Sequence, residues 1–199
     1  MAVNKQPIAR KCRSFDISPA VMGYSNKKSN RNPGGTRRKK VSEYGAQLRE
    51  KQKVKFVYGI QEKQFHAYYE KASKMAGNTG EELLCMIERR LDNVVYRLGF
   101  ASTRREARQL VNHGHFTVNG KRVNIPSYLV KTGDVVAVCE KSCSNAFFKK
   151  LKEDDVFAST PKWLDRDKNT LTGKVIAAPA REDIDFEIAE HLIVELYSK

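Results

Sequence analysis

The stretch 88-ERRLDNVVYRLGFASTRREARQLVNHGHFTVNGKRVNIPSYLVKTGDVVAV-138 decides the fold of this chain. The apolar spacing of its first half predicts short amphipathic helices, and its second half predicts a β-hairpin. Arginines crowd the outer faces of the predicted helices, where like charges repel one another. An arriving anion relieves that repulsion, so we expect this module to hold a phosphate backbone, with RNA as the partner.

Charge is unevenly distributed along the 199 residues, whose formal net charge is +14. It is +12 over residues 1–60, +7 over 61–152 and −5 over 153–199. Such an excess indicates a polyanionic partner, because unbalanced like charge destabilises a compact protein. We expect the first sixty residues to face nucleic acid and the acidic end to face something else. A merely solvated basic tail is the alternative for the first segment.

Composition also excludes some classes of protein. No run of 18 apolar residues is present, so no membrane span is expected. The segment MAVNKQPIARKCRS lacks the apolar stretch of a secretory signal. The cysteines are few and irregularly spaced, which favours a reducing cytosol over a disulfide framework. They are Cys12, Cys85, Cys139 and Cys143.

Residues 1–40 are predicted to be irregular, and the following sixty to be helical. SNKKSNRNPGGTRRKK (25–40) has too little apolar surface to offset its ordering entropy. Ser42 is a predicted N-cap of a helix that Gly59 ends. Tyr44 is among the residues expected to pack inward from that helix. A second helix from about Glu62 carries one apolar stripe, for which we prefer a core role to base stacking. The stripe consists of Phe65, Tyr68, Tyr69, Ala72 and Met75.

Two T-x-x-E capping boxes, Thr79/Glu82 and Thr103/Glu106, predict the starts of the next helices. The first helix continues to Gly99 along the apolar stripe Leu84, Ile87, Leu91, Val94, Val95 and Leu98. Arg89, Asn93 and Arg97 should share one of its faces. In the second helix Arg104, Arg105 and Arg108 should stay outside.

Asn119-Gly120 between apolar residues predicts a tight hairpin, because both turn residues need positive φ. Val135 to Cys139 is uniformly apolar and predicts a fully buried strand. Residues 145–152 are expected to be helical. The segment IDFEIAEHLIVELYSK (184–199) has helical periodicity but could contain a short strand at HLIVEL.

Metal binding and catalysis find little support in the sequence. Cys139 and Cys143 have C-x₃-C spacing, and His113 and His115 could complete a zinc site, but no second cysteine pair follows. Arg90-Leu91-Asp92 resembles the sequence around the catalytic aspartate of pseudouridine synthases, yet here it lies within the arginine-rich module. A surface ion pair of Asp92 with Arg89 explains it, so we expect neither an enzyme nor a cofactor.

Together these segments resemble one family. SEYGAQLREKQKVKFVYG, GNTGEELL, the RRLDNVVYRLG-to-VNG core, PKWL and EHLIVELYSK are similar to the bacterial-type fourth small-subunit ribosomal protein. The resemblance runs from about Val41 onward. It implies an α+β fold with a basic, irregular extension (1–40) and a helical domain (41–86 with 183–199). An Arg-rich RNA-binding domain (87–182), with short helices packed on a small, mainly antiparallel sheet, is inserted in that helical domain.

The resemblance also implies a function. Family members bind the five-prime domain of small-subunit ribosomal RNA and nucleate assembly of the subunit. In the cytoplasmic ribosome they lie near the messenger-RNA entrance and touch the fifth small-subunit protein, where they influence decoding accuracy. The acidic segment from Glu182 to Glu195 would face that neighbour. The implied ribosomal-RNA contacts are Arg49, Lys51, Lys53, Arg89, Arg90, Arg97, Arg104, Arg105, Arg108 and Lys121. The implied messenger-entrance loop is Arg37, Arg38, Lys39 and Lys40.

The first forty residues depart from the family pattern. Many relatives carry a four-cysteine zinc knot there, whereas this chain has only Cys12, so no zinc is expected. Pro33-Gly34-Gly35-Thr36 stands where relatives tend to show P-G-Q-H-G.

Overall fold

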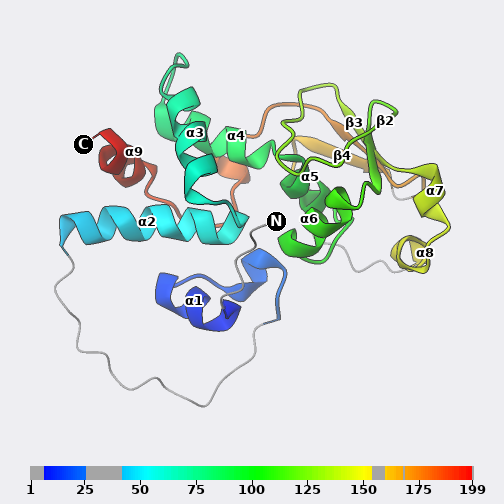
Figure 1. Ribbon diagram of the computed structural model, residues 1–199, viewed down its shortest axis with the longest axis horizontal. Coiled ribbons are helices and arrows are strands. Elements are labelled where there is room, and N and C mark those ends of the chain that lie inside the picture. Colours follow the sequence, from blue (N-terminus) through cyan, green and yellow to red (C-terminus); the bar gives the residue numbers. More distant parts are fainter. Residues whose placement is uncertain (1–6, 26–41, 154–159, 168, 199) are drawn as a thin grey trace. The chain divides into compact units, whose positions relative to one another are not determined.

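The chain divides into two units of different architecture. The computed structural model describes residues 7–25, 42–153, 160–167 and 169–198 (Figure 1). Residues up to 80 and from 185 onward form unit 1, and residues 81–184 form unit 2. Unit 1 therefore joins two segments that are far apart in sequence, whereas unit 2 is continuous.

Unit 1 is helical in its described residues. Its elements are α1 (Ile8–Phe15), the 3₁₀ turn η1 (Pro19–Met22), α2 (Glu43–Tyr58), α3 (Glu62–Ala72) and α9 (Glu190–Ser198). Ser42 caps α2 as predicted, because its Oγ accepts a hydrogen bond from the Gly45 N–H at 3.2 Å. Helix α9 packs along α2, where Gln47 Nε2 donates to Glu195 Oε2 at 3.1 Å. The segment that was ambiguous between helix and strand is thus a helix.

The prediction that residues 1–40 are irregular was wrong for residues 8–22. The Cys12 side chain of α1 is fully buried, and the ring of Phe15 lies 5.7 Å from that of Phe56. These tertiary contacts stabilise a helix too short and too polar to form alone. Arg37 to Lys40 lie outside the described residues.

The predicted aromatic stripe is core over most of its length. Phe65, Tyr68 and Ala72 are buried, as expected. Met75 is 44% exposed, because α3 ends at Ala72 and the helical spacing stops there. Tyr44 was also expected to be buried but is 60% exposed, in the first turn of α2.

Unit 2 is an antiparallel sheet with short helices. Its helices are α4 (Thr79–Glu88, starting just before the boundary), α5 (Leu91–Arg97), α6 (Arg104–Asn112), α7 (Glu140–Cys143), α8 (Ala146–Glu153) and the 3₁₀ turn η2 (Arg181–Asp183). Its strands are β1 (Phe116–Val118), β2 (Lys121–Arg122), β3 (Val135–Val138), β4 (Leu164–Asp167) and β5 (Thr172–Val175), in the order β2-β1-β3-β5-β4. The predicted α+β class is confirmed.

The hairpin forms as predicted, and one face of the sheet carries the core. Asn119 and Gly120 adopt positive φ (50° and 77°) between β1 and β2. Phe116 and Val136 point into an apolar cluster with Leu98 of the α5–α6 segment. Strand β3 is not fully buried, since its residues alternate and Val135 is exposed. A strand of an antiparallel sheet with one covered face shows this alternation even when every residue is apolar.

The helix predicted from Thr79 to Gly99 is broken at Arg89 and Arg90. Arg90 is extended (φ −66°, ψ 137°). The Leu91 N–H donates to the Tyr128 carbonyl at 2.8 Å, and the Asp92 N–H donates to the Pro126 carbonyl. Two helical hydrogen bonds are thus exchanged for bonds to a loop that is distant in sequence, so Arg89 does not share a helix face with Asn93 and Arg97.

Only one of the two predicted capping boxes starts a helix. Thr103 caps α6 by accepting from the Glu106 N–H, while the Glu106 carboxylate accepts from the Ser102 N–H. At α4 the Oδ1 of Asn78 accepts from the Gly80 N–H at 3.1 Å. Because Thr79 is already helical, the cap lies one residue before the predicted position.

Candidate nucleic-acid interface

A buried carboxylate neutralises one of the arginines that the sequence placed on the surface. The Glu88 side chain is fully buried at the end of α4. Its Oε1 accepts from Arg97 Nη2 at 2.9 Å, and its Oε2 accepts from Arg97 Nε at 3.2 Å. Asn93 Nδ2 donates to Oε2 at 2.6 Å, while Asn93 Oδ1 accepts from Arg104 Nε at 2.9 Å. The network joins α4, α5 and α6.

A second buried carboxylate binds two further arginines. Asp92 Oδ1 accepts from Arg90 Nε at 3.1 Å, and Oδ2 accepts from Arg90 Nη2 at 2.9 Å. Arg108 of α6 donates from Nε and Nη2 to the same Oδ2, at 2.9 and 2.7 Å. Forked guanidinium–carboxylate pairs of this kind combine charge with fixed geometry. Asp92 therefore ties α6 to the start of α5.

The expectation of exposed arginine faces was therefore wrong for Arg90, Arg97, Arg104 and, in large part, Arg108. The first three are buried, and the side chain of Arg108 is 16% exposed. The physical reason is that Glu88 supplies the anion for Arg97, and Asp92 supplies it for Arg90 and Arg108, where the sequence pattern suggested that an RNA would supply it. Arg104 is instead held by the Asn93 amide. The guanidinium of Arg104 also lies 4.4 Å from the centroid of the Tyr96 ring.

Arg105 and Lys121 remain available for a ligand. Arg105 is partly exposed on α6 and Lys121 is exposed just after the hairpin turn, and neither forms an ion pair or hydrogen bond through its side chain in the described part of the chain. Arg89 is partly exposed and uses only Nε, which donates to the Val130 carbonyl at 2.9 Å.

Arg122 was not among the predicted site residues, although it is next to Lys121. It is exposed, and its guanidinium is held by the carbonyls of Gly114 and His113 at 2.8 and 3.0 Å. A side chain fixed in this way loses little entropy on binding. Its place beside the Asn-Gly turn was the signal that could have identified it.

The three predicted contacts of unit 1 have partners within the protein. Arg49 of α2 forms an ion pair with Asp16 and donates to the Ser14 carbonyl. Lys51 is buried and lies 2.7 Å from Glu62 Oε1, and Lys53 lies 3.5 Å from Glu50. Of these, only Arg49 is exposed.

Glu62 of α3 is the carboxylate that binds Lys51 in unit 1. Its carboxylate accepts hydrogen bonds from Lys51, Lys55 and the Tyr197 hydroxyl. Burial raises the pKa of Glu62, but these three hydrogen bonds outweigh burial and lower that pKa to about 2. The same contact fastens α9 to α2 and α3.

Asp92 and His115, which the sequence offered for catalysis and for metal binding, make other contacts in the structure. Asp92 is buried and bound by Arg90 and Arg108, not by Arg89 at the surface as the sequence suggested. In the described ranges no three His, Cys, Asp or Glu side chains are placed to hold a metal ion. The His115 Nδ1 lies 2.9 Å from the Ser142 Oγ. Burial lowers the pKa of His115 most, and the charges of His113 and Arg122 lower it further.

No helix in the described residues is long and apolar enough to span a membrane.

Comparison with known proteins defines the class to which this geometry belongs. Residues 89–136 match the S4 domain, and residues 4–88 match the ribosomal protein S4/S9 N-terminal domain. The S4-domain match covers α5, α6, the hairpin and the first half of β3, so the class is that of proteins with an S4 RNA-binding module.

Full-length relatives then identify the family. The chain is 55% identical to the small ribosomal subunit protein uS4 of Lachnospira eligens over the whole of both chains. It is 57% identical to uS4A of Alkaliphilus oremlandii, again over both complete chains. It is 64% identical to uS4 of Caldicellulosiruptor bescii over 83% of this chain and 79% of that protein. The chain belongs to the uS4 family of small-subunit ribosomal proteins.

Proposed function

We propose that this chain is a structural constituent of the small ribosomal subunit that binds ribosomal RNA directly. The observation that carries the proposal is the 55% identity to a uS4 protein over the full length of both chains. The S4 module contributes the RNA-binding surface, and we assign it to the inserted segment 87–182 between the helical segments 41–86 and 183–199.

The RNA-binding surface that we propose on unit 2 is defined by Arg105, Lys121, Arg122 and Arg89. Each is at least partly exposed, and each has guanidinium or ammonium hydrogens directed at no carboxylate in the described residues. Arginine forks suit the crowded phosphates of folded RNA. Arg90, Arg97, Arg104 and Arg108 would support this surface from beneath by fixing α5 and α6, not by reaching phosphates.

Finer aspects of the function rest on the family resemblance and on charge. We propose that the RNA is the five-prime domain of small-subunit ribosomal RNA, that binding nucleates assembly, and that the protein influences decoding accuracy from the cytoplasmic ribosome. The basic segment Arg37–Lys40 would lie by the messenger entrance, and the acidic segment 182–195 would face the fifth small-subunit protein. The role is non-catalytic and needs no cofactor.

Co-sedimentation tests the proposal. The tagged full-length chain should travel with small subunits through a sucrose gradient in moderate salt, and it should protect nucleotides of the five-prime domain in a chemical footprint. A chain found only in the ribosome-free fraction would contradict the proposal and favour a free RNA-binding regulator.

A further inference from the structure

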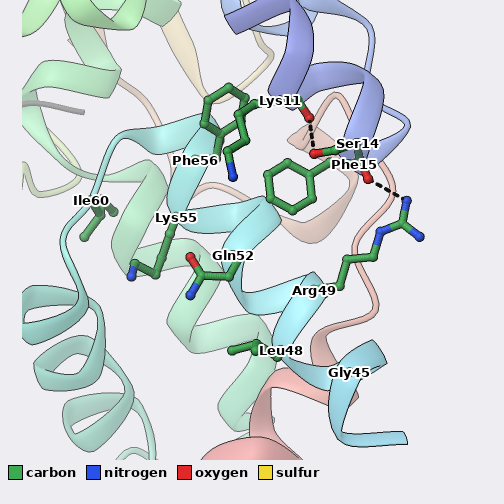
Figure 2. A pocket seen from close by; sticks show the side chains of 10 residues that line it. All are labelled: Lys11, Ser14, Phe15, Gly45, Leu48, Arg49, Gln52, Lys55, Phe56 and Ile60. Carbon is green, nitrogen blue, oxygen red and sulfur yellow. Dashed lines mark hydrogen bonds between the residues drawn. The ribbon is translucent and has the colours of Figure 1, made fainter. Parts of the chain in front are cut away.

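Unit 1 contains a cavity that lies outside the S4-domain match. It has a volume of about 430 Å³ and lies between α1 and α2 (Figure 2). Its lining includes Lys11, Phe15, Arg49, Gln52, Lys55 and Phe56. A space of this size suits one small organic group, since ligand pockets begin at roughly 300 Å³.

The apolar wall of the cavity is aromatic. Phe15 of α1 and Phe56 of α2 approach with ring centroids 5.7 Å apart at 45°. Both line the cavity, and Phe15 is only partly buried. A phenyl face that solvent can reach offers a stacking platform for a planar ring, which every nucleobase has.

A polar amide without a partner lines the same cavity. Gln52 is partly buried, and its side chain makes no hydrogen bond within the part of the chain that the structure describes. A side-chain amide can donate and accept at once, which is the pattern that the edge of a nucleobase presents.

Two cations at the cavity can bind a phosphate. Lys11 has no carboxylate partner among the described residues, and its Nζ lies 5.7 Å from the centroid of the Phe15 ring. Arg49 uses only Nη2 for Ser14 and Asp16, which leaves Nε and Nη1 for a further acceptor. Its partner Asp16 is 81% exposed, and an ion pair so open to water is weak enough to exchange for a phosphate. Lys55 is different, because Glu62 already neutralises it.

We propose that this cavity binds one unstacked nucleotide of single-stranded RNA. The base stacks against Phe15, Gln52 reads its edge, and Lys11 and Arg49 bind its phosphate. Combined aromatic, amide and cationic groups favour a nucleotide over an acidic peptide, which would leave the ring faces unused. The inference rests on the proposed function, because the nucleotide belongs to the same ribosomal RNA that unit 2 binds.

Matched glutamine variants of the full-length chain test the site. Gln52→Leu keeps the size of the side chain and should weaken binding to the five-prime domain RNA about fivefold, through loss of one hydrogen bond to the base. Gln64→Leu makes the same change at an exposed position of α3 outside the cavity and should bind like the parent. Phe15→Leu should weaken binding roughly tenfold, as expected for loss of one stacked base.

Ultraviolet crosslinking gives a second readout that does not depend on a variant folding. Irradiation of the parent chain with the RNA should leave a nucleotide adduct on the peptides that carry Phe15 or Phe56. Equal affinities of the two glutamine variants, missing adducts, or crosslinking of α1 to a protein in the assembled particle would each overturn the site. A parent chain that binds no ribosomal RNA would instead refute the proposed function.

Discussion

Replacing Glu88 by glutamine should destabilise unit 2 by about 3–5 kcal/mol, the typical cost of removing one partner of a buried ion pair. The carboxylate accepts hydrogen bonds at 3.2 and 2.9 Å from Arg97 and at 2.6 Å from Asn93. Glutamine keeps the shape but loses the charge, and its amide nitrogen then faces other donors. The buried Arg97 guanidinium is left without its counter-charge, which is the dominant cost.

Tryptophan fluorescence during urea unfolding measures this loss. Trp163 is the single tryptophan of the chain and is 2% exposed in the apolar cluster of unit 2, so it reports this unit. With a urea slope of about 2 kcal/mol per molar, the midpoint should fall by roughly 2 M. If the variant is too unstable in buffer, sucrose restores a measurable baseline in both proteins.

A matched substitution at an exposed carboxylate supplies the control. Glu140→Gln in α7 should change stability by no more than about 0.5 kcal/mol, because Glu140 is exposed. Pairing Glu88→Gln with Arg97→Leu should cost less than the sum of the single changes, since the buried cation is then removed as well. A Glu88→Gln midpoint equal to that of the control would refute the claim that this carboxylate is the internal counter-ion.

Three further outcomes are expected. Arg105→Ala with Lys121→Ala should leave the fold intact and reduce the slope of log affinity for ribosomal RNA against log salt by about two, one per lost phosphate contact; an unchanged slope would remove both from the interface. Glu62 has a lowered pKa in the folded chain, so its contribution to stability is complete above its unfolded pKa of 4.5 and is lost as the pH falls towards about 2. Glu62→Gln should abolish that part of the acid sensitivity of unit 1. The loss of stability between pH 6 and pH 3, measured by circular dichroism, should therefore be smaller in the variant than in the parent. An equal loss in both proteins would contradict the assignment. Gly173→Ala should destabilise unit 2 by about 1–3 kcal/mol, because the added Cβ would overlap the buried side chain of Leu98. A Trp163 unfolding midpoint equal to that of the parent would show that the helix–sheet contact is looser than the structure indicates.

Local signals predicted much of the fold because they depend on neighbours in sequence. The Ser42 cap, the Gly59 end of α2 and the Asn119-Gly120 turn each require only the chemistry of a few adjacent residues. The break at Arg90 could not be predicted in this way, because it depends on hydrogen bonds to the loop at 126–128. Strands β4 and β5 were missed for a similar reason: Leu164–Asp167 is mostly charged and is a strand only because Thr172–Val175 lies beside it.

The gathering of arginines was predicted from the sequence, but the burial of most of them was not. The sequence showed that arginines gather around residues 88–108, and that much is correct. It did not show that Glu88 lies opposite Arg97, or that Asp92 lies opposite Arg108, because both pairings need α4, α5 and α6 to fold against one another. Counting cations along a sequence therefore overestimates the charge that a partner meets.

The split composition of unit 1 has a consequence for synthesis. A nascent chain presents α1, α2 and α3 first, then unit 2, and only afterwards the segment from 185 onward that carries α9. Unit 1 therefore closes late, because Glu195 and Tyr197 must be synthesised before they can meet Gln47 and Glu62. Until then the buried face of α3 that carries Phe65, which Tyr197 of α9 later covers, is exposed to solvent.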